Sequence, residues 1–237
     1  MRRGSLVLLA GVLAGSAHAN ILIDDFTTGF NSGATSTPFY YDTVAGGALG
    51  GHRYIDHRFT SNPLNRPILT DVNAGAPGNL FIEAGSGVNG QVFVVWAGRI
   101  TSAPTSGPGA LPRGDFFGQS PLVNMSGEQG LLIDYINNDQ SNTGIYAEMW
   151  DVNFNVIASS FSTIGAGFGS VYRGFNSFSL VQGASFDMTQ VKGIAVGVSL
   201  PTGNDITLTR VAAVPEPATM TVLGLGIAAL AARKRRK

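Results

Sequence analysis

The sequence Ile-Tyr-Ala-Glu-Met-Trp at residues 145–150 contains the pattern that decides the fold. In an extended strand, successive side chains point to opposite faces. The Ile, Ala and Met side chains would therefore share one face, and Tyr146, Glu148 and Trp150 would share the other. This alternation predicts a β-strand rather than a helix.

Most of the chain follows the same rule. Gly is abundant, with 32 residues, charged residues make up 13% of the chain, and no long segment has helical periodicity. Together these features predict an all-β protein, an antiparallel two-sheet β-sandwich. Eleven further runs are predicted as strands: Ile21–Phe26, Pro38–Val44, Arg53–Thr60, Ile68–Val72, Leu80–Ala84, Val92–Ala97, Leu131–Ile136, Val156–Ser162, Phe175–Val181, Val191–Leu200 and Ile206–Ala212.

The connections between these runs have turn chemistry. Asp151–Asn155 is predicted to close a short hairpin, and Asn142–Gly144 to end a polar loop. Gly98–Ser120 is rich in Gly, Pro and Ser and is longer than an ordinary connection. No repeat or linker divides the chain, so we expect one domain over residues 20–213.

The N-terminus is predicted to be a Sec-type signal peptide over residues 1–19, and hence a signal helix. Arg2 and Arg3 supply the positive region, and Leu6–Ala14 the apolar region. Ala17 and Ala19 form a small-x-small cleavage site before Asn20. This pattern predicts export through the Sec translocon, with a mature chain that begins at Asn20.

The C-terminus, residues 214–237, carries three signals in a row. Val214-Pro215-Glu216-Pro217 cannot lie inside a helix, because proline fixes φ and lacks an N–H donor. Ala218–Ala232 is uncharged and predicts a short transmembrane helix, although about 22 Å of helix is less than the ~30 Å hydrocarbon core. Five cations follow, as expected on the cytoplasmic side: Arg233, Lys234, Arg235, Arg236 and Lys237.

This arrangement closely resembles the PEP-CTERM sorting signal of Gram-negative bacteria. The resemblance implies recognition by an exosortase, a membrane protease, which removes the helix after export. It further implies transient anchoring in the inner membrane, followed by a cell-surface or extracellular location. An alternative is a permanently membrane-anchored binding module.

Composition excludes several classes of function. Seven of the fifteen basic residues lie in the two targeting segments, leaving eight, whereas fourteen of the fifteen acidic residues remain in the mature region. A net charge near −6 argues against nucleic acid as a partner. The chain has no Cys, which excludes disulfides and thiolate chemistry.

Six short segments are spread across most of the predicted mature region: Ile23–Phe26, Ala48–Arg53, Trp96–Gly98, Phe175-x-x-Phe178, Val191–Ile194 and Asn204–Leu208. Their layout resembles that of one group of PEP-CTERM proteins, which is itself similar to jelly-roll carbohydrate-binding modules. That resemblance implies a jelly-roll-like sandwich.

Motifs for catalysis are weak. Gly85–Gly90 has dinucleotide-binding spacing, but a strand follows it where a helix is required, so we expect a hairpin loop. His52 and His57 would point to opposite faces of one strand, which disfavours a shared metal. Paired carboxylates could hydrolyse glycosides, but no pair is marked by its spacing. We therefore expect a non-enzymatic domain without a cofactor, the alternative being a carbohydrate-active enzyme.

Two binding sites are candidates. Calcium requires oxygen ligands. Asp24 and Asp25 lie on the first predicted strand and Asp205 at the start of the last, and these two strands commonly run side by side in a jelly roll. Sugar binding would use aromatic side chains, with Trp96, Tyr146 and Trp150 as the candidates. The expected function is a structural or polysaccharide-associated protein of the cell envelope or extracellular matrix.

Overall fold

The computed structural model describes residues 20–28, 32–36, 39–44, 46–73, 78–97 and 122–215. The predicted signal peptide, the segment from Glu216 to Lys237 and the Gly98–Ser120 loop lie outside these residues. Within the described residues, no helix is long and apolar enough to cross a membrane.

Fifteen strands form the described structure, with three short 3-10 turns between them. The strands are β1 (Ile21–Asp24), β2 (Ser32–Thr35), β3 (Phe39–Val44), β4 (His52–Ser61), β5 (Ile68–Val72), β6 (Leu80–Ala84), β7 (Asn89–Ala97), β8 (Gly130–Asn138), β9 (Gly144–Asp151), β10 (Val156–Ala158), β11 (Ser162–Thr163), β12 (Gly167–Gly174), β13 (Ser179–Gln182), β14 (Val191–Leu200) and β15 (Asp205–Val214). The turns are η1 (Leu49–Gly51), η2 (Phe175–Ser177) and η3 (Met188–Gln190).

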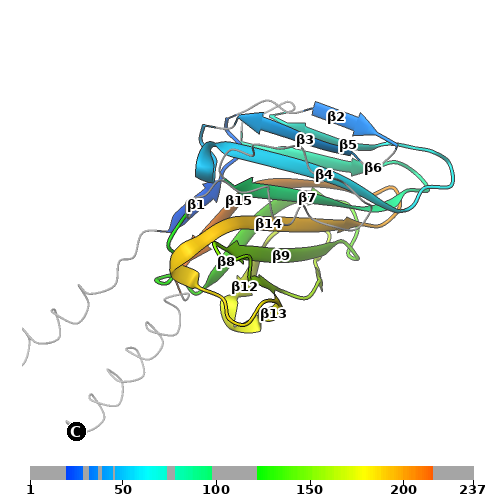
Figure 1. Ribbon diagram of the computed structural model, residues 1–237. Coiled ribbons are helices and arrows are strands. Elements are labelled where there is room, and N and C mark those ends of the chain that lie inside the picture. The colour runs from blue at the N-terminus through cyan, green and yellow to red at the C-terminus, as the bar shows by residue number, and fades with distance from the viewer. Residues whose placement is uncertain are drawn as a thin grey trace, which may run out of the picture.

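The strands form two sheets that pack face to face (Figure 1). Sheet A has the order β12-β8-β15-β6-β5-β2, with β1 also paired to β15. Sheet B has the order β13-β10-β9-β14-β7-β4-β3, with β11 also paired to β9. Every pairing between these strands is antiparallel, which confirms the predicted two-sheet β-sandwich.

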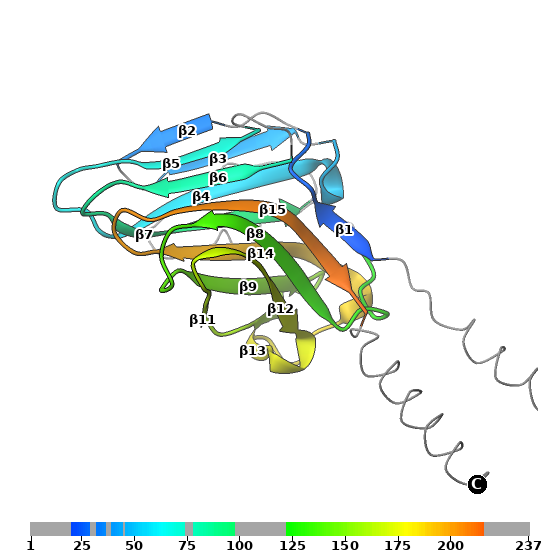
Figure 2. The ribbon, with the colours of Figure 1, turned by 180° about the vertical axis from the view of Figure 1, so that it is seen from behind.

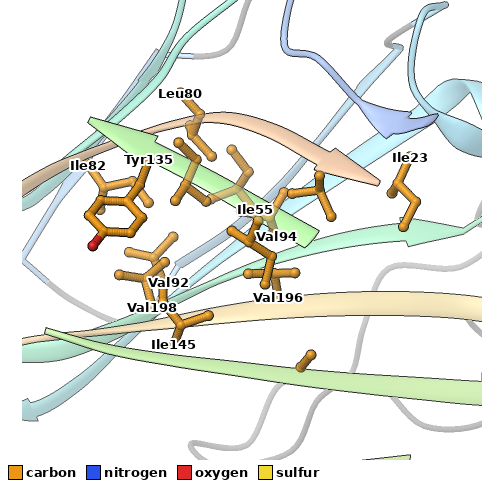
Figure 3. Packing of buried hydrophobic residues seen from close by; sticks show 14 of the residues in the cluster. Ile23, Ile55, Leu80, Ile82, Val92, Val94, Tyr135, Ile145, Val196 and Val198 are labelled. Carbon is orange, nitrogen blue, oxygen red and sulfur yellow. The ribbon is translucent and has the colours of Figure 1, made fainter. Parts of the chain in front are cut away.

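The core fills the space between the sheets. Side chains from both sheets point toward one another there, including Ile55, Val94 and Val196 from sheet B and Leu80 and Ile82 from sheet A (Figure 3). Each is fully buried, and burying such a side chain stabilises the fold by about 1.5–3 kcal/mol. Because side chains alternate along a strand, each of these strands contributes every second side chain to the core.

The predicted strands correspond to observed ones with three corrections. Phe175–Ser177 is a 3-10 turn, and its strand begins at Ser179. The predicted strand Val156–Ser162 ends at Ala158, and Ser162 begins β11. The structure also contains β2 and β12, which the sequence pattern did not predict.

Gly85–Gly90 is not a hairpin loop, because β6 belongs to sheet A and β7 to sheet B. The segment carries the chain between the sheets, and Val88 at its centre is fully buried in the core. Gly87 has φ of 83°, a left-handed conformation that glycine adopts readily. The other two predicted turns are confirmed at the ends of β9.

Candidate functional site

Asp24 on β1 is the centre of a buried polar network. Its carboxylate accepts hydrogen bonds from Arg53 Nε at 2.6 Å and Arg53 Nη2 at 2.7 Å, and the Asp24 and Arg53 side chains are fully buried. Trp96 Nε1 donates to Asp24 Oδ2 at 2.7 Å, and the Phe26 N–H donates to Oδ1 at 2.7 Å. The network joins β1, β4 and β7, and its role is structural because the carboxylate already accepts four bonds.

His52 and His57 behave as the strand pattern predicted. His57 lies on the core face of β4, where its Nε2 is 2.9 Å from Thr70 Oγ1 on β5 in the opposite sheet. Burial lowers the pKa of His57 to about 4. His52 stacks on Tyr54 with 6.0 Å between ring centroids. His57 therefore forms an inter-sheet hydrogen bond and is neutral at pH 7.

The face of sheet B that points away from the core carries a cluster of aromatic side chains. Phe93, Tyr146 and Phe161, with Arg58, form what we call the aromatic row. Tyr146 stacks on Phe161 at 4.9 Å between centroids and meets Phe93 edge-on at 6.1 Å. Arg58 lies over the Phe93 ring at 4.4 Å. Phe161 is 44% exposed, so the row reaches solvent at this end.

Two carboxylates accompany the aromatic row. Tyr146 Oη donates to Glu148 Oε2 at 2.6 Å, and Arg58 Nε donates to Asp56 Oδ2 at 2.6 Å. Burial raises the pKa of Asp56, while the charge of Arg58 opposes that shift. Charge and aromatic surface are therefore interleaved along this face.

Of the three aromatic residues predicted to contact sugar, only Tyr146 belongs to the aromatic row. Trp96 lies in the core and Trp150 in a second buried cluster, and each is at most 1% exposed. The prediction is wrong for these two, because an indole without exposed surface offers no ring face to a sugar. Sequence reasoning missed Phe93, Phe161 and Arg58, since their contacts join segments that are far apart in the sequence.

The predicted calcium ligands do not meet. β1 and β15 do run side by side, as predicted, but Asp24 lies opposite Val211. Asp205 is six residues away along β15, about 20 Å at the rise of a strand. Asp25 bonds Thr27 instead, with its Oδ1 accepting from Thr27 Oγ1 at 2.6 Å. Among the described residues, no group of three His, Cys, Asp or Glu could hold a metal ion.

Asp205 lies with other acidic residues. It lies opposite Glu83 in the pairing of β15 with β6. Burial raises its pKa, and the negative charges of Glu83 and Asp139 raise it further. This end of sheet A is therefore a region of unfavourable negative charge.

The predicted sorting signal begins on the last strand. Val214 ends β15, pairs with Gly130 of β8 and is 8% exposed. Pro215 follows directly and is half-buried. Ile21 of β1, the first described strand, pairs with Ala213, so the beginning of β1 and the end of β15 lie side by side (Figure 2).

Comparison with known protein families matches residues 213–236 to the PEP-CTERM protein-sorting motif. The chain carries this motif. It covers about a tenth of the sequence and overlaps the last two residues of β15, Ala213 and Val214. None of the curated proteins compared with the chain is similar to it.

Several solved structures resemble the chain in fold. The family 11 carbohydrate-binding module of the cellulosomal cellulase Lic26A-Cel5E of Clostridium thermocellum is 11% identical, with a TM-score of 0.42 over 85% of this chain and 97% of that one. The Clostridium thermocellum module in complex with a β-1,3-1,4-mixed-linked tetrasaccharide is 12% identical, with a TM-score of 0.41 over 84% and 98%. An agarase, AgWH50C, is 9% identical, with a TM-score of 0.41 over 68% of this chain and 22% of that one.

Proposed function

We propose that this protein is exported through the Sec translocon, anchored transiently in the inner membrane by its C-terminal segment, and released by an exosortase. The observation that carries this proposal is the sorting motif at residues 213–236, which begins on the last two residues of β15, the final strand of the β-sandwich. The folded domain is then the cargo, delivered to the cell surface or the extracellular matrix.

Replacing Pro215, Glu216 and Pro217 with alanine tests the sorting step. We expect export to continue while the C-terminal segment stays attached, because the recognition element is lost and the export signal is not. Fractionation of the producing cells should find the variant in membranes and the wild type released. Pro201→Ala, in the turn before β15, is the control and should be released normally. Normal release of the triple variant would refute the sorting assignment.

We propose further that the domain is a non-enzymatic, polysaccharide-associated component and needs no cofactor for this role. Glycosidases hold two carboxyl groups about 5–9.5 Å apart. On the face of sheet B that points away from the core, Glu148 on β9 and Asp56 on β4 are three strand spacings apart and offset by two residues, about 16 Å between backbones. This separation favours binding over hydrolysis by that pair.

The aromatic row supports polysaccharide binding, because an exposed ring backed by a second ring presents an apolar face to a sugar. Phe161→Ala should weaken retention of the mature domain in gels that contain extracellular polysaccharide purified from the producing cells, by up to about tenfold. Phe168 is 85% exposed on β12 of sheet A, so Phe168→Ala is the matched control. Equal loss in both variants, or no retention of the wild type, would contradict this role.

A further inference from the structure

The end of β15 is held on both sides. Ala213 pairs with Leu131 of β8 and with Ile21 of β1. Val214 pairs with Gly130, and its carbonyl accepts the Gln129 N–H at 2.9 Å. The sheet therefore holds the backbone up to the carbonyl of the bond that joins Val214 to Pro215.

A protease commonly binds its substrate as an extended strand whose backbone N–H and C=O groups bond to the enzyme. The backbone groups near Ala213 already bond to neighbouring strands, and its side chain is fully buried. These backbone groups can enter a protease groove only after β15 has separated from both β8 and β1. Pro215 is the first residue beyond the strand.

From this arrangement we infer that the exosortase cuts C-terminal to Pro215 while the domain is folded, and that the paired end of β15 sets the N-terminal limit of the cut. This inference rests on the proposed sorting function. In the reaction, one peptide bond breaks. Its carbonyl carbon bonds to the oxygen of water or the nitrogen of an amine, and the departing nitrogen takes the proton of that nucleophile.

The position of β15 in the sheet explains why this limit matters. β15 is an interior strand of sheet A, between β8 and β6, and it also pairs with β1. A cut within Val211–Val214 would remove residues that pair with two strands at once. A cut beyond Pro215 leaves every pairing of β15 intact, so the released domain keeps the same fold.

Intact mass and C-terminal peptide analysis of the mature protein from the producing cells tests the limit. We expect a terminus at Pro215 or beyond, with a free acid identifying water as the nucleophile and an added mass identifying an amine. A terminus at or before Val214 would overturn this inference and leave the sorting function standing. A product that still ends in Lys237 would instead overturn the sorting function.

A spacer provides a second test. Inserting about six Gly and Ser residues between Val214 and Pro215 moves the motif away from the paired strand. Pulse-chase measurement should find cleavage about fivefold faster, because unpaired spacer residues then precede the cut in place of Val214, whose carbonyl is held by the Gln129 N–H. The cut should keep its position relative to Pro215. An unchanged or slower rate would show that the end of β15 does not limit access.

Discussion

Asp24 shows how a single residue can organise a core. Its carboxylate connects β1 to Arg53 on β4 and Trp96 on β7. The Arg53 guanidinium also lies over the Phe26 ring, 5.0 Å from its centroid. Because a buried charge is tolerated only when it is paired, the three strands must come together for any one of these groups to be satisfied.

Asp24→Asn should lower the free energy of unfolding by about 3–5 kcal/mol, because it leaves the Arg53 charge buried without its partner. Urea unfolding followed by tryptophan fluorescence measures this loss. Asp134→Asn breaks the Arg210–Asp134 pair, which is 3.3 Å long and partly exposed, and should cost no more than about 1 kcal/mol. Similar losses in both variants would contradict a special role for the buried pair.

His57 should make stability depend on pH. Its pKa is about 4 in the folded protein and about 6.5 in the unfolded chain, so the unfolded chain binds more protons between these values. The stabilisation is complete above pH 6.5 and is lost as pH falls toward 4. From pH 7.5 to 5 the free energy of unfolding should fall by about 2 kcal/mol. His57→Gln should flatten this dependence in urea titrations, and a wild type with no such fall would disprove it.

At the scale of the element, β7 and β14 are buried on both faces. Val92, Val94 and Trp96 face the core, while Phe93 and Val95 belong to the second buried cluster. Where a neighbouring strand approaches the backbone of such a strand closely, only a small residue fits. A Cβ on Gly90 at the start of β7 would lie 2.5 Å from the Arg58 carbonyl oxygen. The spacing of β4 and β7 therefore requires glycine there.

Gly90→Ala should destabilise the domain by about 1–3 kcal/mol, because the new methyl group meets backbone that cannot move without disturbing the β4–β7 pairing. Gly165→Ala is the control, since a Cβ there has no heavy atom within 4 Å. Thermal melts followed by circular dichroism compare the two. A lower melting temperature for Gly165→Ala than for Gly90→Ala would contradict the steric argument.

At the scale of the whole molecule, the first and last strands of the sandwich, β1 and β15, pair with each other. β1 begins one residue after the predicted signal-peptide site, and it pairs with the strand that runs into the sorting motif. Both predicted targeting segments therefore adjoin the same pair of strands. The aromatic row lies on sheet B, whereas β1 and β15 belong to sheet A, so the proposed ligand surface and the strands next to these segments belong to different sheets.

The sequence by itself determined the all-β class, most strand positions, the opposite orientation of His52 and His57, and the sorting motif. Each is a local property, because strand alternation and a motif of consecutive residues need no information about distant neighbours. β12 escaped prediction since its run Gly-Phe-Gly-Ser-Val-Tyr-Arg-Gly contains three glycines and lies at the edge of sheet A.

Tertiary structure alone decided which residues meet. The register of β1 on β15 separated Asp24 from Asp205, and the same packing placed Asp24 beside Arg53 and Trp96. Exposure was likewise decided by packing, which buried both tryptophans and left Phe161 open to solvent. The physical reason is that antiparallel register and burial follow from contacts between segments far apart in the chain, which local periodicity does not encode.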